Sequence, residues 1–242
     1  MPESSVAPPG TATPATKPSQ VWRLFQVLLT YAWYIGALFL GAGRFNWTRG
    51  WISVGLSVVC MTALGLVAQR YNPELMAQRA RWRRKDTKRF DKIFLSVYLP
   101  LVLFHPVLAG LDAVRFRWSS MPFAFVYVGG AIYVASAAVI GRVMVVNPYA
   151  ESSVRIQNDR GHAVVSSGPY RFVRHPMYVG IIVMGIAMPL VWGSQWALLL
   201  GGVTAMMFVV RTALEDLTLR RELPGYEEYA ARTRYRLIPG VW

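Results

Sequence analysis

Six apolar runs are the feature that most restricts the fold of this chain. They occupy Leu24–Ala42, Trp51–Ala68, Ile93–Leu111, Phe123–Val146, Tyr178–Trp192 and Trp196–Val210. A helix needs about 20 mostly apolar residues to cross a bilayer, so the first four runs come close, whereas the last two need help from flanking residues. With 54% hydrophobic residues and a mean hydropathy of +0.33, the chain is predicted to be an all-α, polytopic integral membrane protein with about six transmembrane helices.

The distribution of basic residues predicts the orientation of these helices. If both termini and the segment Gln69–Lys92 are cytoplasmic, 22 of the 26 lysines and arginines lie on that side. This asymmetry follows the positive-inside rule. The simplest interpretation of the basic segment is that its charges only set the membrane topology. The alternative is that it binds anionic lipid headgroups or an acidic substrate. The formal charge of +14 does not indicate nucleic-acid binding, because the basic residues fall between apolar runs and no groove-reading motif is present.

The chain divides into three parts. Residues 1–20 are rich in Pro, Ser, Thr and Ala, which predicts a disordered tail. Residues 21–146 hold the first four helices, of which the first two are expected to form a hairpin. Residues 147–242 hold polar segments, a tight helical hairpin over 178–210 and a C-terminal amphipathic helix on the cytoplasmic face. The apolar side of that last helix is expected to consist of Leu219, Leu223, Tyr226, Tyr229 and Leu237.

A polar island lies just before the predicted hairpin, at Ser166–Gly180. It combines Arg171, Arg174 and His175 with two prolines and two tyrosines. Pro176 is expected to begin a helix, whose free N–H groups and basic neighbours suit an anionic or zwitterionic ligand. The alternative is that the two arginines are membrane-flanking charges and the prolines mark turns.

A second polar pair follows the hairpin. Arg211 and Glu215 are four residues apart and therefore project from one helical face. The alternative to a functional role is an intrahelical ion pair, which contributes little stability. Because the hairpin returns both polar clusters to the same membrane surface, we expect a pocket there for a zwitterionic cofactor and a lipid-soluble substrate.

Three further polar or reactive features are interpreted more simply. His105, in the middle of the third run, is expected to form a hydrogen bond between helices. Cys60 is expected to be a small buried apolar side chain. The segment from Gln157 to His162 is polar enough to bind a ligand, but it lacks the spacing of a metal site, so no metal is expected.

Several short motifs carry a resemblance to a known family. They are Asn72-Pro73-Glu74-Leu75, Gly161-His162, Gly168-Pro169-Tyr170, Arg174-His175-Pro176-Met177-Tyr178, Arg211, Gly225-Tyr226-Glu227-Glu228-Tyr229 and Arg236-Leu237-Ile238-Pro239-Gly240. On these residues the chain resembles the isoprenylcysteine carboxyl methyltransferase family over roughly residues 70–242. Members are integral membrane enzymes that use S-adenosylmethionine as methyl donor and are also similar to phospholipid N-methyltransferases.

The resemblance implies a role for each matching residue. Arg211 would face the methyl acceptor and Glu215 would bind the polar end of the donor, which makes these two the candidate catalytic residues. The implied donor-binding residues are Gln157, His162, Ala163, Val164, Val165, Tyr170, His175, Pro176, Met177, Tyr178 and Glu215. Many members have paired glutamates where this chain has Glu215-Asp216, so the role of Asp216 stays open.

The leading hypothesis is carboxyl O-methylation of a prenylcysteine-like or other lipidic acid. A carboxylate is nucleophilic at neutral pH and needs no general base. An amine acceptor, as in phospholipid N-methylation, must first lose a proton, and only Glu215 or a histidine is placed to take it. A membrane reductase that binds NADPH is a further alternative, because some sterol reductases resemble the His-Pro-x-Tyr element. A membrane scaffold without activity is the non-enzymatic alternative, and the oligomeric state is left open.

Overall fold

The computed structural model describes residues 20–80 and 86–242, and over these residues it contains helices and no strand. The predicted disordered tail falls almost entirely on residues 1–19, outside the described residues. The α-helices are α1 (Gln20–Ala42), α2 (Thr48–Tyr71), α3 (Pro73–Arg79), α4 (Arg89–Gly110), α5 (Ala124–Val146), α6 (Pro176–Trp192), α7 (Gln195–Glu222) and α8 (Tyr226–Arg232). A π-helix over Leu111–Phe116 extends α4, and two short 3-10 helices cover Asn158–Arg160 and Gly168–Arg171.

Five of these helices are long and apolar enough to cross a membrane. They are α1, α2, α4 with its π-helical extension, α5 and α7, and the shorter apolar α6 has 17 residues. Many of their large apolar side chains are exposed on the outside of the bundle, which suits contact with lipid. The prediction of an all-α, polytopic membrane protein is therefore confirmed.

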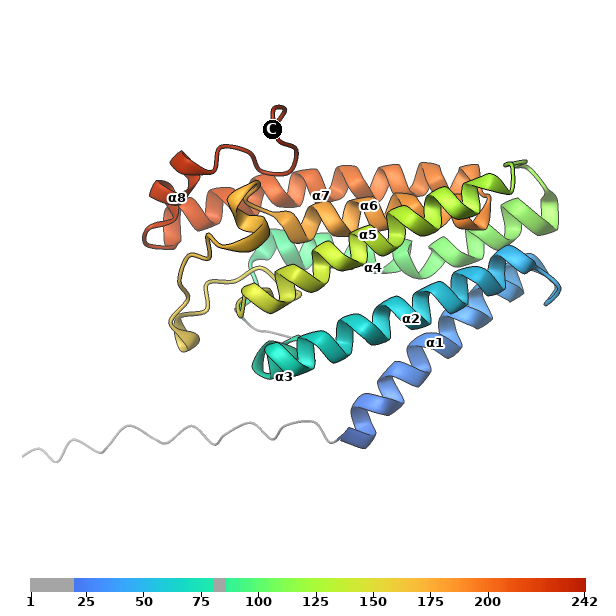
Figure 1. Cartoon of the computed structure of the whole chain (residues 1–242), viewed down its shortest axis with the longest axis horizontal. Helices are drawn as coiled ribbons and strands as arrows, with labels where there is room; N and C mark the ends of the chain where they lie inside the picture. Colours follow the sequence, from blue (N-terminus) through green and yellow to red (C-terminus); the bar gives the residue numbers. More distant parts are fainter. Residues whose placement is uncertain (1–19, 81–85) are drawn as a thin grey trace, which may run out of the picture.

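The polar parts of the chain gather at one end of the bundle. In Figure 1, α3, α8 and the segment 147–175 lie at the left end, and the short turns that join the long helices lie at the right end. At the turn end, buried Asp112 accepts hydrogen bonds from Ser119 and Ser194 and from the backbone of Trp196. Asp112 thereby joins the π-helix to the turn between α6 and α7, an anchor that sequence reasoning did not identify.

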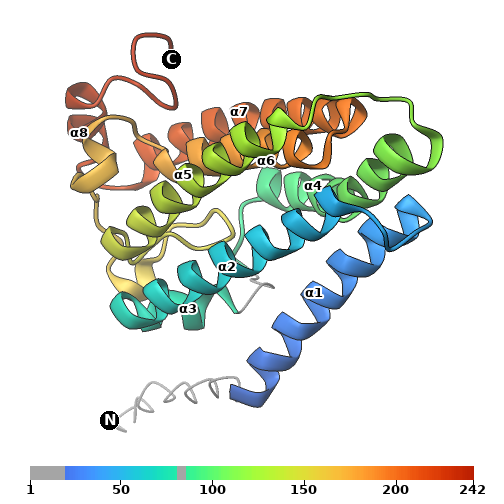
Figure 2. The same cartoon turned by 45° about the vertical axis from the view of Figure 1, so that its right-hand side comes forward.

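The first helix packs differently from its prediction. We expected α1 and α2 to form a hairpin, but α1 packs mainly on α4, and it diverges from α2 beyond their turn (Figures 1 and 2). Two glycines explain the choice of partner, because Gly41 lies against the Val107 carbonyl and Gly110 against the Leu38 carbonyl. A Cβ atom at either position would overlap backbone atoms, so glycine permits this close approach.

The second half of the bundle is built from α5, α6 and α7. The predicted tight hairpin is seen at Gly201 of α7, where a Cβ would lie 2.9 Å from the Gly185 carbonyl of α6. His105 forms the expected interhelical hydrogen bond, its Nε2 lying 2.8 Å from the Ala197 carbonyl oxygen, and Cys60 is buried as predicted. The Gly201 contact therefore packs α7 closely on α6, and the His105 hydrogen bond joins α7 to α4.

The C-terminal part does not form the single amphipathic helix that we expected. Instead α7 continues twelve residues beyond the predicted end at Val210, to Glu222, and α8 covers only Tyr226–Arg232. The apolar side chains of this region are buried against the protein itself, among them Leu223, Tyr226 and Tyr229. The region therefore closes the polar end of the bundle instead of presenting an apolar face to the membrane.

Candidate functional site

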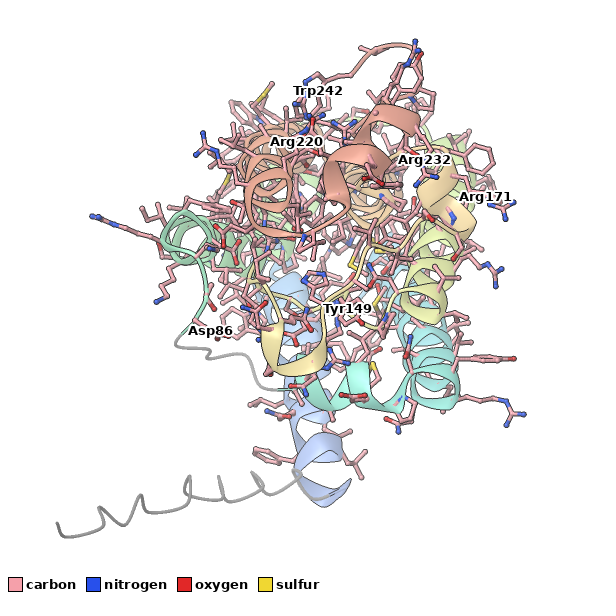
Figure 3. The ribbon with its side chains drawn as sticks, turned by 90° about the vertical axis from the view of Figure 1, so that its left-hand side faces the viewer. Asp86, Tyr149, Arg171, Arg220, Arg232 and Trp242 are labelled. Carbon is pink, nitrogen blue, oxygen red and sulfur yellow. The ribbon has the colours of Figure 1, made fainter. Side chains whose placement is uncertain are left out.

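A cavity at the polar end of the bundle brings most of the predicted site residues together. Its empty volume is about 820 Å³, part of which is open to solvent. Ten of the eleven residues implied for donor binding line it, namely Gln157, His162, Ala163, Val164, Val165, Tyr170, His175, Met177, Tyr178 and Glu215. Pro176 is buried and begins α6 as predicted, but it does not line the cavity. Figure 3 shows this end of the molecule, with Tyr149 near the centre and Arg171 at the edge.

The start of α6 is fixed by the C-terminal segment. The backbone N–H of Arg174 donates to the Tyr235 carbonyl, and the N–H of His175 donates to the Arg236 carbonyl. Pro176 at the first helical position needs no N–H partner. The wall of the cavity from His175 to Tyr178 is therefore held by residues that follow α8, about 60 positions later in the chain.

Asp216 is the centre of the polar network behind this wall. It is fully buried, and its carboxylate pairs with Arg174 at 2.7 Å, Arg236 at 3.0 Å and Arg220 at 3.3 Å. Tyr226 donates its hydroxyl at 3.0 Å, and His175 Nε2 lies 3.4 Å away. The role of Asp216, which the sequence left open, is thus structural: it ties α7 to the start of α6 and to the C-terminal segment.

The two arginines of the polar island have different environments. Arg174 is buried and also donates to the carbonyls of Thr233 and Arg234, so its interpretation as a membrane-flanking charge is wrong. Arg171 is exposed at the edge of the molecule (Figure 3). Only Arg171 therefore remains suited to contact with lipid headgroups.

Arg211 and Glu215 both contact Tyr178, Arg211 at the ring and Glu215 at the hydroxyl. Glu215 lines the cavity and accepts a short hydrogen bond from the Tyr178 hydroxyl. Arg211 does not line the cavity, and its guanidinium carbon lies 5.1 Å from the centre of the Tyr178 ring and 4.5 Å from that of Phe94. The intrahelical Arg211–Glu215 pair that we weighed is absent among the described residues, because Arg211 pairs with another carboxylate.

That carboxylate is Asp91, in the first turn of α4. Asp91 is fully buried, its Oδ1 lies 2.8 Å from Arg211 Nε, and its Oδ2 accepts the backbone N–H of Val154. Arg211 also donates to the Ser152 carbonyl at 2.9 Å. Sequence reasoning counted Asp91 only as an acid in the basic segment. The available signal was an acid at the same membrane edge as Arg211.

The segment 149–162 closes one side of the cavity and is held by ion pairs. Buried Arg155 pairs with Glu151 at 3.0 Å and with Asp159 at 2.7 Å, and Arg160 pairs with Glu74 of α3 at 2.9 Å. The amide of Gln157 is already engaged, because it donates to the Tyr149 carbonyl and accepts from Arg160. Gln157 thus lines the cavity with one donor and one acceptor position of its amide already occupied.

Aromatic and imidazole groups complete the lining. The ring of Tyr149 lies 4.6 Å from that of His162, centre to centre. Burial, together with the charge of Arg155, lowers the pKa of His162, so the imidazole is neutral at neutral pH. Burial raises the pKa of Tyr170, and it raises that of Tyr229 to about 12. The tyrosine hydroxyls are therefore neutral hydrogen-bonding groups.

No group of three or more His, Cys, Asp or Glu side chains within residues 20–80 and 86–242 is arranged to hold a metal ion.

A comparison with known protein families gives one match. Residues 123–221, from the start of α5 to the last turn of α7, match the isoprenylcysteine carboxyl methyltransferase (ICMT) family. This stretch contains the polar island, the segment 149–162, Arg211 and Glu215, and it excludes α3, α8 and the C-terminal segment. A comparison with curated proteins gives no match. The resemblance seen in the sequence motifs is confirmed over residues 123–221.

Proposed function

Because residues 123–221 match the isoprenylcysteine carboxyl methyltransferase family, we propose that this protein is a membrane methyltransferase that transfers a methyl group from S-adenosylmethionine to the carboxylate of a prenylcysteine-like or other lipidic acid. The observation that carries the proposal is the arrangement around Tyr178. A carboxylate at the cavity, Glu215, and a guanidinium toward the membrane, Arg211, flank the same ring. A ligand with a positively charged group, bound at Glu215, and a ligand with a negatively charged group, bound at Arg211, can therefore lie next to each other.

The chemistry of the cavity lining suits S-adenosylmethionine. Glu215 offers a carboxylate to the ammonium group of the donor, and Tyr149 and His162 offer flat surfaces to its adenine ring. Met177 and Tyr178 line the same cavity and would lie beside the sulfonium. When bound, the donor supplies an electrophilic methyl group on sulfur.

Arg211 is suited to hold the acceptor. Its guanidinium group is fixed by Asp91 and the Ser152 carbonyl, and it is stacked between aromatic rings of α4, α6 and α7. A guanidinium binds a carboxylate through paired, charge-assisted hydrogen bonds. A carboxylate oxygen held there is ionised at neutral pH, so this chain's residues need to orient it and exclude water, and no general base is required.

The aromatic surroundings of Arg211 also suit a lipid-like acceptor. Phe94, Tyr98 and Phe208 form an aromatic cluster with ring centres 5.1 Å apart, in which Phe94 stacks on Tyr98 and both meet Phe208 edge to face. An apolar chain attached to the acceptor would extend along this surface into the bilayer. By the positive-inside rule, we propose that the site and both termini are cytoplasmic.

Calorimetry on the detergent-purified protein tests the donor assignment. We expect S-adenosylmethionine to bind and NADPH not to bind, and Glu215→Gln to weaken donor binding at least tenfold, the size of one charge-assisted hydrogen bond. Glu228→Gln, which alters an exposed carboxylate on α8, is the matched control and should bind the donor normally. Binding of NADPH alone would refute the methyltransferase proposal and support a reductase.

The same variants separate an enzyme from a scaffold. Arg211→Ala and Glu215→Ala should abolish methyl transfer while the detergent-extracted protein remains folded by circular dichroism. Full activity in both variants would show that the site is misplaced.

A further inference from the structure

Arg79, the last residue of α3, is a partly buried guanidinium without a carboxylate partner. Its Nη1 donates to the Ala150 carbonyl at 2.6 Å and lies 3.8 Å from the sulfur of Met177. Within the described ranges, no carboxylate lies within ion-pair distance of Arg79. A partly buried cation of this kind is costly unless an anion compensates it.

The arginines near Arg79 are, by contrast, paired. Arg155 and Arg160 share Glu151, Arg160 also pairs with Glu74, and Arg211 pairs with Asp91. Burial, joined by the charge of Arg211, lowers the pKa of Arg79, while Glu151 acts in the opposite direction. Among these four arginines, Arg79 is therefore the one that has no carboxylate within ion-pair distance in the described ranges.

Arg79 and Arg211 both donate to backbone carbonyls of the segment 150–152. Arg79 donates to the carbonyl of Ala150, and Arg211 donates to the carbonyl of Ser152. Arg79 also contacts Met177, whose neighbour Tyr178 stacks on Arg211. The two guanidinium groups thus border the part of the site where the donor-binding wall meets the acceptor-binding surface.

We propose that Arg79 is a second acceptor-binding residue, which together with Arg211 holds the carboxylate of the methyl acceptor and selects for an anionic acceptor. This inference rests on the proposed function, and it adds a residue that lies outside the segment matched to the family. An ionised carboxylate has enough lone pairs for two guanidinium groups. An ammonium group in the same place would meet two positive charges and would be rejected.

Selection of an anionic acceptor by Arg79 and Arg211 also affects the choice between O-methylation and N-methylation. A free amine acceptor lacks the negative charge that Arg79 needs. A phospholipid amine carries a phosphate that satisfies the arginines while its nitrogen reaches the donor, so this class is included in the test as an outcome.

The test compares Arg79→Gln with wild type and with Arg70→Gln, a control that alters an exposed arginine at the end of α2. The two probes are an N-acetylated S-prenylcysteine acid and its carboxamide, which has the same shape without the charge. Thermal shift in detergent without the methyl donor measures binding, and steady-state kinetics with the donor measures KM for the acid.

We expect Arg79→Gln to weaken binding of the acid and raise its KM by about tenfold to a hundredfold, the loss of one charged hydrogen-bonding partner. Binding of the carboxamide should change less than about threefold, and Arg70→Gln should behave like wild type. Arg79→Lys should recover part of the affinity for the acid, because it restores the charge without the planar fork.

Three outcomes would overturn the inference. Equal weakening of the acid and the carboxamide would show that Arg79 only supports the fold. An unchanged preference for the acid would show that Arg79 does not contact the acceptor. Methylation of phosphatidylethanolamine that depends on Arg79 would show that its anion is a phosphate. Because the thermal shift needs no methyl donor, these outcomes stay distinct from a failure of wild type to methylate any acid, which would instead refute the proposed function.

Discussion

Replacement of Asp216 by Asn tests the polar network that supports the cavity wall. The substitution keeps the shape of the side chain and removes the charge that three arginines share. Arg174 is 3% exposed and would keep its two backbone acceptors and one neutral amide oxygen, but it would lose its charged partner. Breaking a buried ion pair by neutralising one partner costs about 3–5 kcal/mol, because the other charge stays buried.

This cost converts to a change that a thermal melt can measure. For a chain of this size, 1 kcal/mol corresponds to a shift of about 2–4 °C in Tm, so Asp216→Asn should lower the Tm by about 6–20 °C. The donor should also bind more weakly, since His175 and the start of α6 lose their support. The assay is a detergent thermal melt with and without S-adenosylmethionine.

A matched control is available on one of the same arginines. Arg220 also pairs with Glu227 at 2.6 Å, and the Glu227 side chain is 67% exposed. Glu227→Gln should therefore cost at most about 1 kcal/mol. If Asp216→Asn melted within about 2 °C of Glu227→Gln, the idea that Asp216 anchors the site would be refuted.

Three further changes test other parts of the account. Gly110→Val should prevent α1 from packing on α4 and lower the Tm by several degrees in the same melt, and an unchanged Tm would contradict the close approach. Asp91→Asn should lower kcat/KM by about ten- to a hundredfold by releasing Arg211, with unchanged donor affinity by calorimetry; a loss of donor affinity instead would place Arg211 in the donor site. The pKa of His162 is lowered in the folded protein, so the unfolded chain binds the proton more readily. This difference does not change the free energy of unfolding above the unfolded pKa of about 6.5, and it lowers that free energy as the pH falls below this value. Melts between about pH 7.5 and 5 should therefore show a smaller acid loss of Tm for His162→Gln than for wild type, and parallel curves would contradict this assignment.

The hydropathy of the chain was sufficient to predict the class of fold, because the length of an apolar run reports directly on a membrane span. The packing partner of α1 was not predictable in the same way. It depends on Gly41 and Gly110, which meet only when helices far apart in the sequence are placed together. The end of α7 was missed because its polar residues, such as Asp216, are buried by partners from other segments and not exposed beyond the membrane.

The residues of the candidate site were also predictable only in part. His175, Met177, Tyr178 and Glu215 were identified from the motifs and the resemblance that they carry, and they line one cavity in the structure. Asp91 and Arg79 were not identified, because each gains its meaning from Arg211, more than a hundred positions later in the chain. The sequence of a basic segment does not indicate which of its charged residues will contact such a distant partner in the folded chain.

The most direct test of the account is the chemistry of the product. Purified protein in lipid nanodiscs would be given S-adenosylmethionine with a labelled methyl group and an S-prenylcysteine acid, and the product would then be treated with base. A carboxyl methyl ester releases its label as methanol under base, whereas an N-methyl group does not. The account predicts base-labile label on the acid, lost in Arg211→Ala. Base-stable label on a phospholipid amine, or no transfer to the acid, would contradict it.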